Sequence, residues 1–174
     1  MKPIAGATPF NQIAYVVDDL DAGVKWWTEV MGVGPFMMLR DLVYDESDLH
    51  GESMILGLHA AIAYSGDINI ELIQPVGRSI FAEWREAGRE GMHHTCVFTD
   101  DFAATEKDVL ARGGKRLQGG RISGGIIGYY AMGGDQGVIL EVAQLGEGAT
   151  ALFGALRHAA RTWDGKNPHF TITG

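Results

Sequence analysis

Four polar residues interrupt otherwise apolar stretches of the sequence that are typical of strands: Gln12, Glu71, His94 and Glu141. An ionised carboxylate on such a strand is costly unless it pairs with a cation or binds one. Neither INIELIQP (68–75) nor GVILEVAQL (137–145) contains a lysine or an arginine that could pair with its glutamate. One imidazole nitrogen and three oxygen donors suit octahedral coordination of a divalent ion, with positions left for water or substrate. The residue types therefore indicate a metal site, provided that the fold brings them together.

The chain contains one segment in two copies. NQIAYVVDDL (11–20) aligns with HHTCVFTDDF (93–102), which matches Gln12 with His94 at an offset of 94 − 12 = 82 residues. Each copy alternates as a half-buried strand does. A helical stretch follows each copy, opening with acidic residues and closing on glycine.

The two glutamate-bearing stretches repeat in the same way. Each is the last strand-like run of its half, and Glu71 matches Glu141 at an offset of 141 − 71 = 70 residues. The chain is therefore predicted to hold two β-α-β-β-β units, an α+β architecture. Internal symmetry of this kind would bring all four polar residues together at a pseudo-two-fold axis, where one ion per chain would bind.

Strand alternation predicts which side chains face inward. Successive residues of a strand point to opposite faces, and the helix should cover the more apolar one. Gln12 is then left on the concave side. The same reasoning directs His94 inward rather than His93, together with Cys96 and Phe98.

These motifs resemble those of the vicinal oxygen chelate superfamily, which includes glyoxalase I, methylmalonyl-CoA epimerase, bleomycin-resistance proteins and extradiol dioxygenases. The resemblance extends from about Phe10 to Leu145 and rests on NQIAYVVDDL, NIELIQP, GMHHTCVFTDD and GVILEVAQL. It implies that the two units form a curved, cup-shaped mixed sheet. It also implies that the metal ligands come from the first and last strands of each unit, at Gln12, Glu71, His94 and Glu141.

The resemblance implies a reaction class as well. A divalent ion, whether zinc, nickel, cobalt, manganese or iron, would hold a carbonyl-bearing or thioester substrate and stabilise an enolate, while Glu141 or Glu71 moves the proton. A lyase, an isomerase and an epimerase all fit this logic. MHH followed by an alternating strand is most similar to the epimerases, and the Gln/Glu/His/Glu composition is most similar to animal-type glyoxalase I.

Two other functions of the same superfamily stay open. An iron(II) dioxygenase uses two histidines and one carboxylate, whereas Gln12 leaves only His94 in this ligand set. A non-catalytic small-molecule binding or resistance protein would need no ligand set at all. The low count of basic residues argues against a large polyphosphate handle such as coenzyme A.

Three further residues are candidates for the substrate pocket. Phe98 shares the inward face of its strand with His94. Tyr130 is expected to face the cup because we match it with Ile62 of the first unit. Arg40 could clamp a substrate carboxylate, although a solvated surface arginine is the more ordinary interpretation.

Composition excludes several other classes of protein. The formal net charge is −8, and the 14 basic residues are scattered, so we expect no nucleic-acid partner. No apolar run approaches the roughly 20 residues that a membrane span needs. Cys96 is the only cysteine, which excludes an internal disulfide and favours a reducing, cytoplasmic location.

We expect a single domain over 1–174, with a first unit (10–75), a connecting helix (76–91), a second unit (92–145) and a C-terminal helix and tail (146–174). The tail carries apolar residues at helical spacing and must dock on its own domain or on a second subunit. Because relatives commonly pair their units across subunits, we expect a homodimer.

Overall fold

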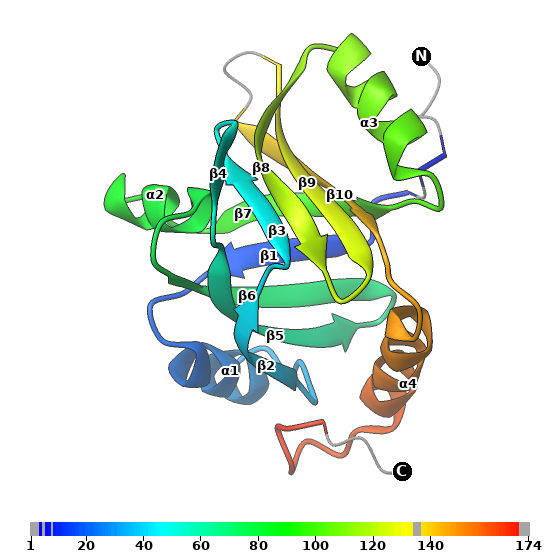
Figure 1. Ribbon diagram of the computed structural model, residues 1–174. Coiled ribbons are helices and arrows are strands. Elements are labelled where there is room, and N and C mark those ends of the chain that lie inside the picture. Colours follow the sequence, from blue (N-terminus) through cyan, green and yellow to red (C-terminus); the bar gives the residue numbers. More distant parts are fainter. Residues whose placement is uncertain (1–3, 5, 8, 134–136, 171–174) are drawn as a thin grey trace.

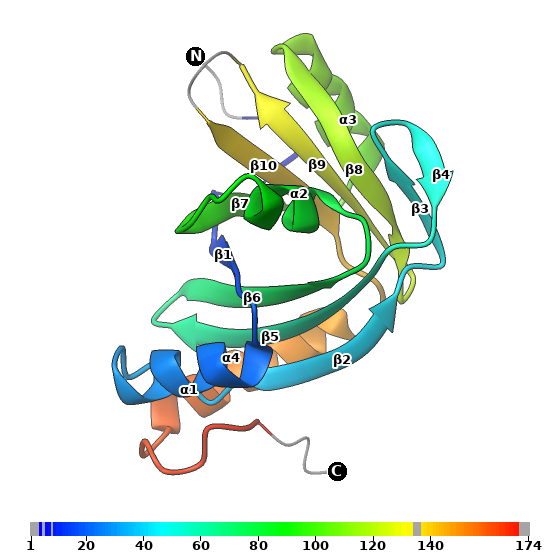
Figure 2. The same ribbon diagram turned by 90° about the vertical axis from the view of Figure 1, so that its left-hand side faces the viewer.

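The computed structural model describes residues 4, 6, 7, 9–133 and 137–170, which form a ten-stranded sheet with helices around it. The strands are β1 Gln12–Val16, β2 Met37–Val43, β3 Glu46–Leu49, β4 Glu52–Met54, β5 Gly57–Ser65, β6 Ile68–Val76, β7 Met92–Phe98, β8 Gly114–Ile122, β9 Gly125–Met132 and β10 Val138–Gln144. The helices are α1 Leu20–Glu29, α2 Ile80–Glu86, α3 Phe102–Ala111 and α4 Ala149–Thr162. The strand order is β2-β5-β6-β1-β7-β10-β9-β8-β3-β4, and Figure 2 shows this sheet curled into a cup.

The predicted α+β fold of two repeated units is confirmed. The first unit runs β1-α1-β2-β5-β6 and the second runs β7-α3-β8-β9-β10. Figure 1 shows α1 and α3 at opposite ends of the molecule, each packed on the outside of its own half of the sheet. No helix in the described ranges is long and apolar enough to cross a membrane.

The centre of the sheet is where the two units meet. β1 pairs in parallel with β6, β7 pairs in parallel with β10, and β1 and β7 join the two pairs in antiparallel fashion. Ala14 lies opposite both Glu71 and His94, and Cys96 lies opposite both Gln12 and Glu141. Since directly paired residues point to the same face of a sheet, all four polar residues project from one face of these four neighbouring strands.

The repeat also explains how each helix begins. Asp19 and Asp101, the second aspartates of the two Asp-Asp pairs, cap α1 and α3 by accepting a first-turn backbone N–H at 2.9 and 3.0 Å. Gln74 and Gln144 each accept the N–H of the first helical residue through Oε1, at 2.9 and 3.0 Å. These matched glutamines therefore anchor the helices to the last strand of each unit.

The first unit contains a hairpin that the sequence analysis did not predict. In the sequence β3 and β4 come between β2 and β5, but in the sheet β3 pairs with β8 of the second unit. This insertion explains why Gln12 and Glu71 of the first unit are further apart in the sequence than His94 and Glu141 of the second. The guanidinium of Arg116 reinforces the join, because its Nη2 atom lies 2.8 Å from Asp48 Oδ1.

Helix α4 docks on its own chain. Leu156 is fully buried with Met37, Ile62 and Tyr64 of the first unit. The segment after α4 returns to the sheet, where the N–H of Phe36 donates to the Pro168 carbonyl at 2.7 Å. The apolar face of the tail therefore gives no support to the homodimer, which stays a prediction. Residues 171–174 of the predicted tail lie outside the described residues.

We predict that Leu156→Ala lowers the free energy of unfolding by about 2–5 kcal/mol, because it leaves a cavity between α4 and the sheet. Urea denaturation measures the change. Leu110→Ala is the matched control, since Leu110 is half exposed on α3 and should cost far less. Equal losses in the two variants would show that α4 does not dock as described.

Candidate metal and substrate site

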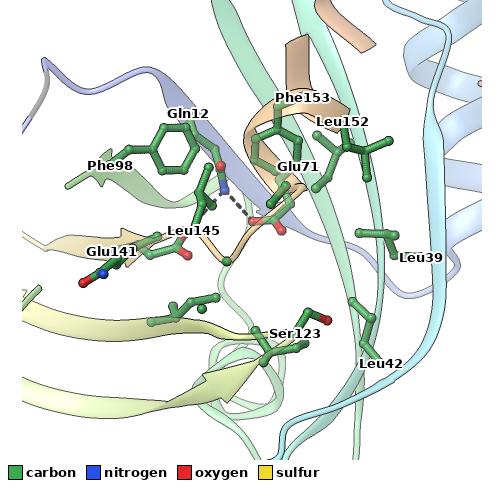
Figure 3. Close-up of a pocket in the computed structure, with 18 of the residues that line it drawn as sticks. Gln12, Leu39, Leu42, Glu71, Phe98, Ser123, Glu141, Leu145, Leu152 and Phe153 are labelled. Carbon is green, nitrogen blue, oxygen red and sulfur yellow. Dashed lines mark hydrogen bonds between the residues drawn. The ribbon is translucent and has the colours of Figure 1, made fainter. Parts of the chain in front are cut away.

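The two units bring the four predicted ligand residues into one cluster. His94 Nε2 lies 2.9 Å from Glu141 Oε2 and 3.6 Å from Glu71 Oε2. The Gln12 amide nitrogen donates to Glu71 Oε2 at 2.8 Å and reaches Glu141 Oε2 at 3.4 Å. Figure 3 shows Gln12, Glu71 and Glu141 directed toward a common point.

The geometry and burial of this cluster fit a divalent ion. Ligand atoms of Glu71, His94 and Glu141 all lie within 4.8 Å of one another. His94 is 1% exposed, and its Nε2 atom makes no hydrogen bond of regular geometry within the described part of the chain. A half-turn of the Gln12 amide would present its oxygen in place of its nitrogen. Four donors from four adjacent strands could then surround one ion.

Electrostatics in the cluster favour a cation. Burial alone would lower the pKa of His94, but the carboxylates of Glu141 and Glu71 outweigh it and raise the pKa to about 9. Burial, with the charge of Glu141 beside it, raises the pKa of Glu71 above its ordinary value. Without metal, the proton on His94 therefore neutralises part of the negative charge of Glu71 and Glu141. A bound divalent ion would take over that role.

A hydrogen bond to His93 orients the imidazole of His94. The two Nδ1 atoms are 2.8 Å apart, so one must donate and the other accept. Burial and the neighbouring His94 charge lower the pKa of His93 to about 3, which keeps His93 neutral. Since the raised pKa of His94 puts a proton on both of its nitrogens in the metal-free site, its Nδ1–H donates to His93 Nδ1, and its Nε2 faces the carboxylates. Metal-binding histidines are generally oriented by a hydrogen bond of this kind.

Two tyrosines that the sequence analysis did not assign complete the floor of the cup. Tyr129 of β9 stacks edge-on against His94, with ring centroids 5.2 Å apart. Its hydroxyl is hydrogen-bonded to that of Tyr44, which follows β2. Burial raises the pKa of both phenols above the ordinary value, so both are neutral beside Glu141.

The predicted pocket residue Tyr130 lies on the other face of the sheet, which corrects our expectation. In the first unit Ile62 pairs with Glu71, and in the second unit Tyr129 pairs with Glu141. Tyr129 is thus the counterpart of Ile62, and our match was displaced by one residue, which reverses the face of a strand. The Tyr130 hydroxyl instead donates to Glu106 at 2.6 Å beneath α3.

The other two predicted pocket residues have opposite outcomes. Phe98 lines the cavity above the carboxylates, as expected. Arg40 does not line it: its Nη2 atom lies 2.5 Å from Asp21 Oδ1 on the exposed side of β2. Residue type alone suggested a carboxylate clamp, but Leu39 faces the cavity, so strand alternation turns Arg40 to the other face of β2, toward Asp21 of α1.

The carboxylates lie at one end of a cavity inside the cup. Its volume is about 220 Å³, and its walls come from β2, β5, β9, the loop after β10 and α4. Figure 3 shows Leu152 and Phe153 of α4 on one side of this cavity and Leu39 and Leu42 of β2 on another. A molecule bound there would touch Glu71 and Glu141 directly.

A family model described as "Glyoxalase/Bleomycin resistance protein/Dioxygenase superfamily" matches residues 11–130. The chain belongs to this superfamily, in agreement with the repeated motifs. No curated protein sequence matches the chain significantly.

Solved structures of the same fold include methylmalonyl-CoA epimerase from Mycobacterium tuberculosis, at 18% identity and a TM-score of 0.60, covering 87% of this chain and 97% of that one. A hypothetical protein from Bacillus halodurans is 16% identical, with a TM-score of 0.57 over 80% of this chain and 95% of that one. A variant of Streptomyces coelicolor methylmalonyl-CoA epimerase, in complex with 2-nitronate-propionyl-CoA, is 22% identical with a TM-score of 0.53, over 79% and 94%. At these identities the likeness establishes the fold alone.

Proposed function

We propose that this protein is a divalent-metal-dependent lyase, isomerase or epimerase that moves a proton next to the carbonyl group of a small molecule. One observation carries the proposal: Gln12, Glu71, His94 and Glu141 converge at the end of a cavity that a substrate can enter. Structural neighbours named as epimerases support it at the level of the superfamily.

The bound ion and the two glutamates would have different roles in this reaction. A divalent ion, when bound, would polarise a substrate oxygen and make the neighbouring C–H more acidic. Glu141 is the proposed base, because it borders both the His94 nitrogen and the cavity. Glu71 faces it across the cluster and is the alternative base, with its carboxylate held by the Gln12 amide. Both can act only if they loosen from the ion during turnover.

A dioxygenase is less well supported by this ligand set. The facial triad of iron(II) oxygenases needs two imidazoles and one carboxylate. The only other histidine beside the cluster, among the described residues, is His93, and its Nδ1 atom is engaged by His94. We therefore favour proton transfer over oxygen chemistry.

The experiment that tests the proposal is a substrate screen in deuterated water. Metal-loaded protein is mixed with ketones, hydroxyketones, diones and thioesters, and NMR follows deuterium entering the position next to the carbonyl. The proposal expects exchange with at least one substrate and loss of that exchange after chelation of the metal. Exchange that survives complete metal removal would contradict it.

Metal affinity is predicted to rise with pH. The raised pKa of His94, about 9, means that the metal-free site is protonated at neutral pH, whereas a ligand nitrogen must be deprotonated. Metal binding should therefore release at least one proton, and affinity should increase roughly tenfold per pH unit below pH 9 until the next group titrates. Calorimetry in buffers of different ionisation enthalpy counts the protons. Binding that is independent of pH and buffer would contradict this coupling.

A further inference from the structure

We propose that the substrate is an uncharged, largely apolar molecule of modest size, carrying its two neighbouring oxygens at one end and a hydrocarbon ring or chain at the other. This inference rests on the proposed function and specifies its substrate class. It would exclude coenzyme A thioesters and carboxylate-bearing substrates.

The cavity has one polar end and an apolar remainder. Beyond Glu71 and Glu141 its walls are mainly aliphatic and aromatic side chains from several elements, among them Leu39, Leu42, Phe98, Leu145, Leu152 and Phe153 (Figure 3). Few other polar side chains line the cavity away from this end: Ser123, Gln144, whose Oε1 accepts the N–H of Phe102, and Tyr44 and Tyr129, whose hydroxyls bond each other. Such a wall offers dispersion contacts and few free hydrogen-bonding groups.

No cationic side chain of the described residues faces the cavity. Among the described residues that line it there is no lysine, arginine or histidine. The two arginines of α4, Arg157 and Arg161, turn away and pair with Asp67 at 3.1 and 3.2 Å. A buried carboxylate or phosphate of the substrate would thus lack a partner, and an unpaired buried charge is strongly unfavourable.

The loaded metal site supplies no surplus charge either. Glu71 and Glu141 together carry two negative charges, and neutral His94 and Gln12 add none, so a divalent ion makes the site neutral overall. Here an anionic substrate gains no long-range attraction, whereas a neutral chelating oxygen pair still finds open coordination positions.

The volume sets the size. An engineered protein cavity of about 150 Å³ binds benzene. The cavity of about 220 Å³ described above therefore accommodates a benzene-sized ring with a short chain. A chain bearing a dione or hydroxyketone would place its oxygens beside the carboxylates and its ring among Leu39, Phe98 and Leu152.

The test compares four probes by calorimetry on zinc-loaded and metal-free protein. They are 1-phenyl-1,2-propanedione, its ring para-carboxylate, propylbenzene and propionyl-CoA. We expect the neutral dione to bind zinc-loaded protein at least about 30-fold more tightly than its para-carboxylate or propionyl-CoA. Propylbenzene has no oxygens and should bind equally with and without metal. Equal or tighter binding of either charged probe, or no binding of propylbenzene, would overturn the inference.

A matched pair of variants sharpens the test. Leu152→Arg places a cation in the cavity wall and should narrow or reverse the preference for the neutral dione. Ala151→Arg adds the same charge one residue away, on the exposed face of α4, and should leave the preference unchanged. Thermal melts followed by circular dichroism check that both variants fold. If Leu152→Arg does not fold, the probe comparison on the unmodified protein still decides the question.

The outcomes separate this inference from the proposed function. Zinc binding and hydrogen exchange, accompanied by a preference for propionyl-CoA, would remove the apolar substrate and keep the enzyme. Propylbenzene binding without any zinc binding would keep the apolar cavity and move the protein to the class of small-molecule binders.

Discussion

Replacing Glu141 by glutamine is expected to lower the rate of hydrogen exchange next to the substrate carbonyl by at least about 100-fold. The amide is nearly isosteric and can still offer an oxygen to the metal, but it cannot accept the proton. The fold should persist, because the side chain is packed between β7 and β9 in the same shape. NMR in deuterated water, with a substrate from the screen, measures the rate, and metal titration shows whether partial binding remains.

Glu71→Gln is the internal control, since the repeat places Glu71 opposite Glu141 across the cluster. A large loss in only one variant identifies which carboxylate carries the proton. If both single variants exchange at the unmodified rate, neither carboxylate is the base, and the proposed mechanism has to be abandoned even though the metal site survives.

Replacing His94 by leucine is expected to weaken metal binding by at least about 100-fold, because even partners that merely orient a ligand are worth 10–100-fold. The variant removes the imidazole ligand of the cluster. The metal would then have only the two carboxylates and the Gln12 amide as protein ligands. Titration with zinc or manganese measures the affinity. His158→Leu is the control, since His158 is exposed on α4 and does not line the cavity that contains Glu71 and Glu141. An equal loss in the two variants would show that binding is nonspecific.

The convergence of the four candidate ligands could be predicted because symmetry restricts their positions. A single histidine or glutamate on a strand has many ordinary explanations, but Gln12 and His94 occupy equivalent positions of a repeat, as do Glu71 and Glu141. The pairing of β1 with β6 and of β7 with β10 places the four side chains on one face, as alternation had indicated.

Other parts of the site depend on information that alternation does not contain. The Gly-rich segment before Tyr129 contains two adjacent isoleucines, Ile126 and Ile127, and therefore shows no alternation that would fix the register. The bulge between Arg116 and Gln118 also shifts β8 against β9, so Tyr129 and Tyr130 could not be distinguished. The contact between His93 and His94 depends on side-chain rotation rather than spacing. The sequence does contain a signal for each feature, namely the adjacent pairs Tyr129–Tyr130 and His93–His94.

The sequence also did not reveal which distant segments α4 and the β3-β4 hairpin contact. The apolar spacing of α4 predicted that it must be covered, but not that its partners are Met37, Ile62 and Tyr64 of the first unit. The hairpin β3-β4 carries charged residues without clear strand alternation, so its pairing with β8 appears only in three dimensions. Helix α4 forms one wall of the cavity, so the proposed substrate class rests on the structure rather than on the sequence.

Metal stoichiometry tests the central claim most directly. Protein stripped with a chelator is titrated with zinc, nickel, cobalt or manganese, and the bound metal is counted by elemental analysis. Because the two units contribute one ligand set between them, we predict one ion per chain in the unmodified protein. No bound metal with any of these ions, or two ions per chain, would contradict the account.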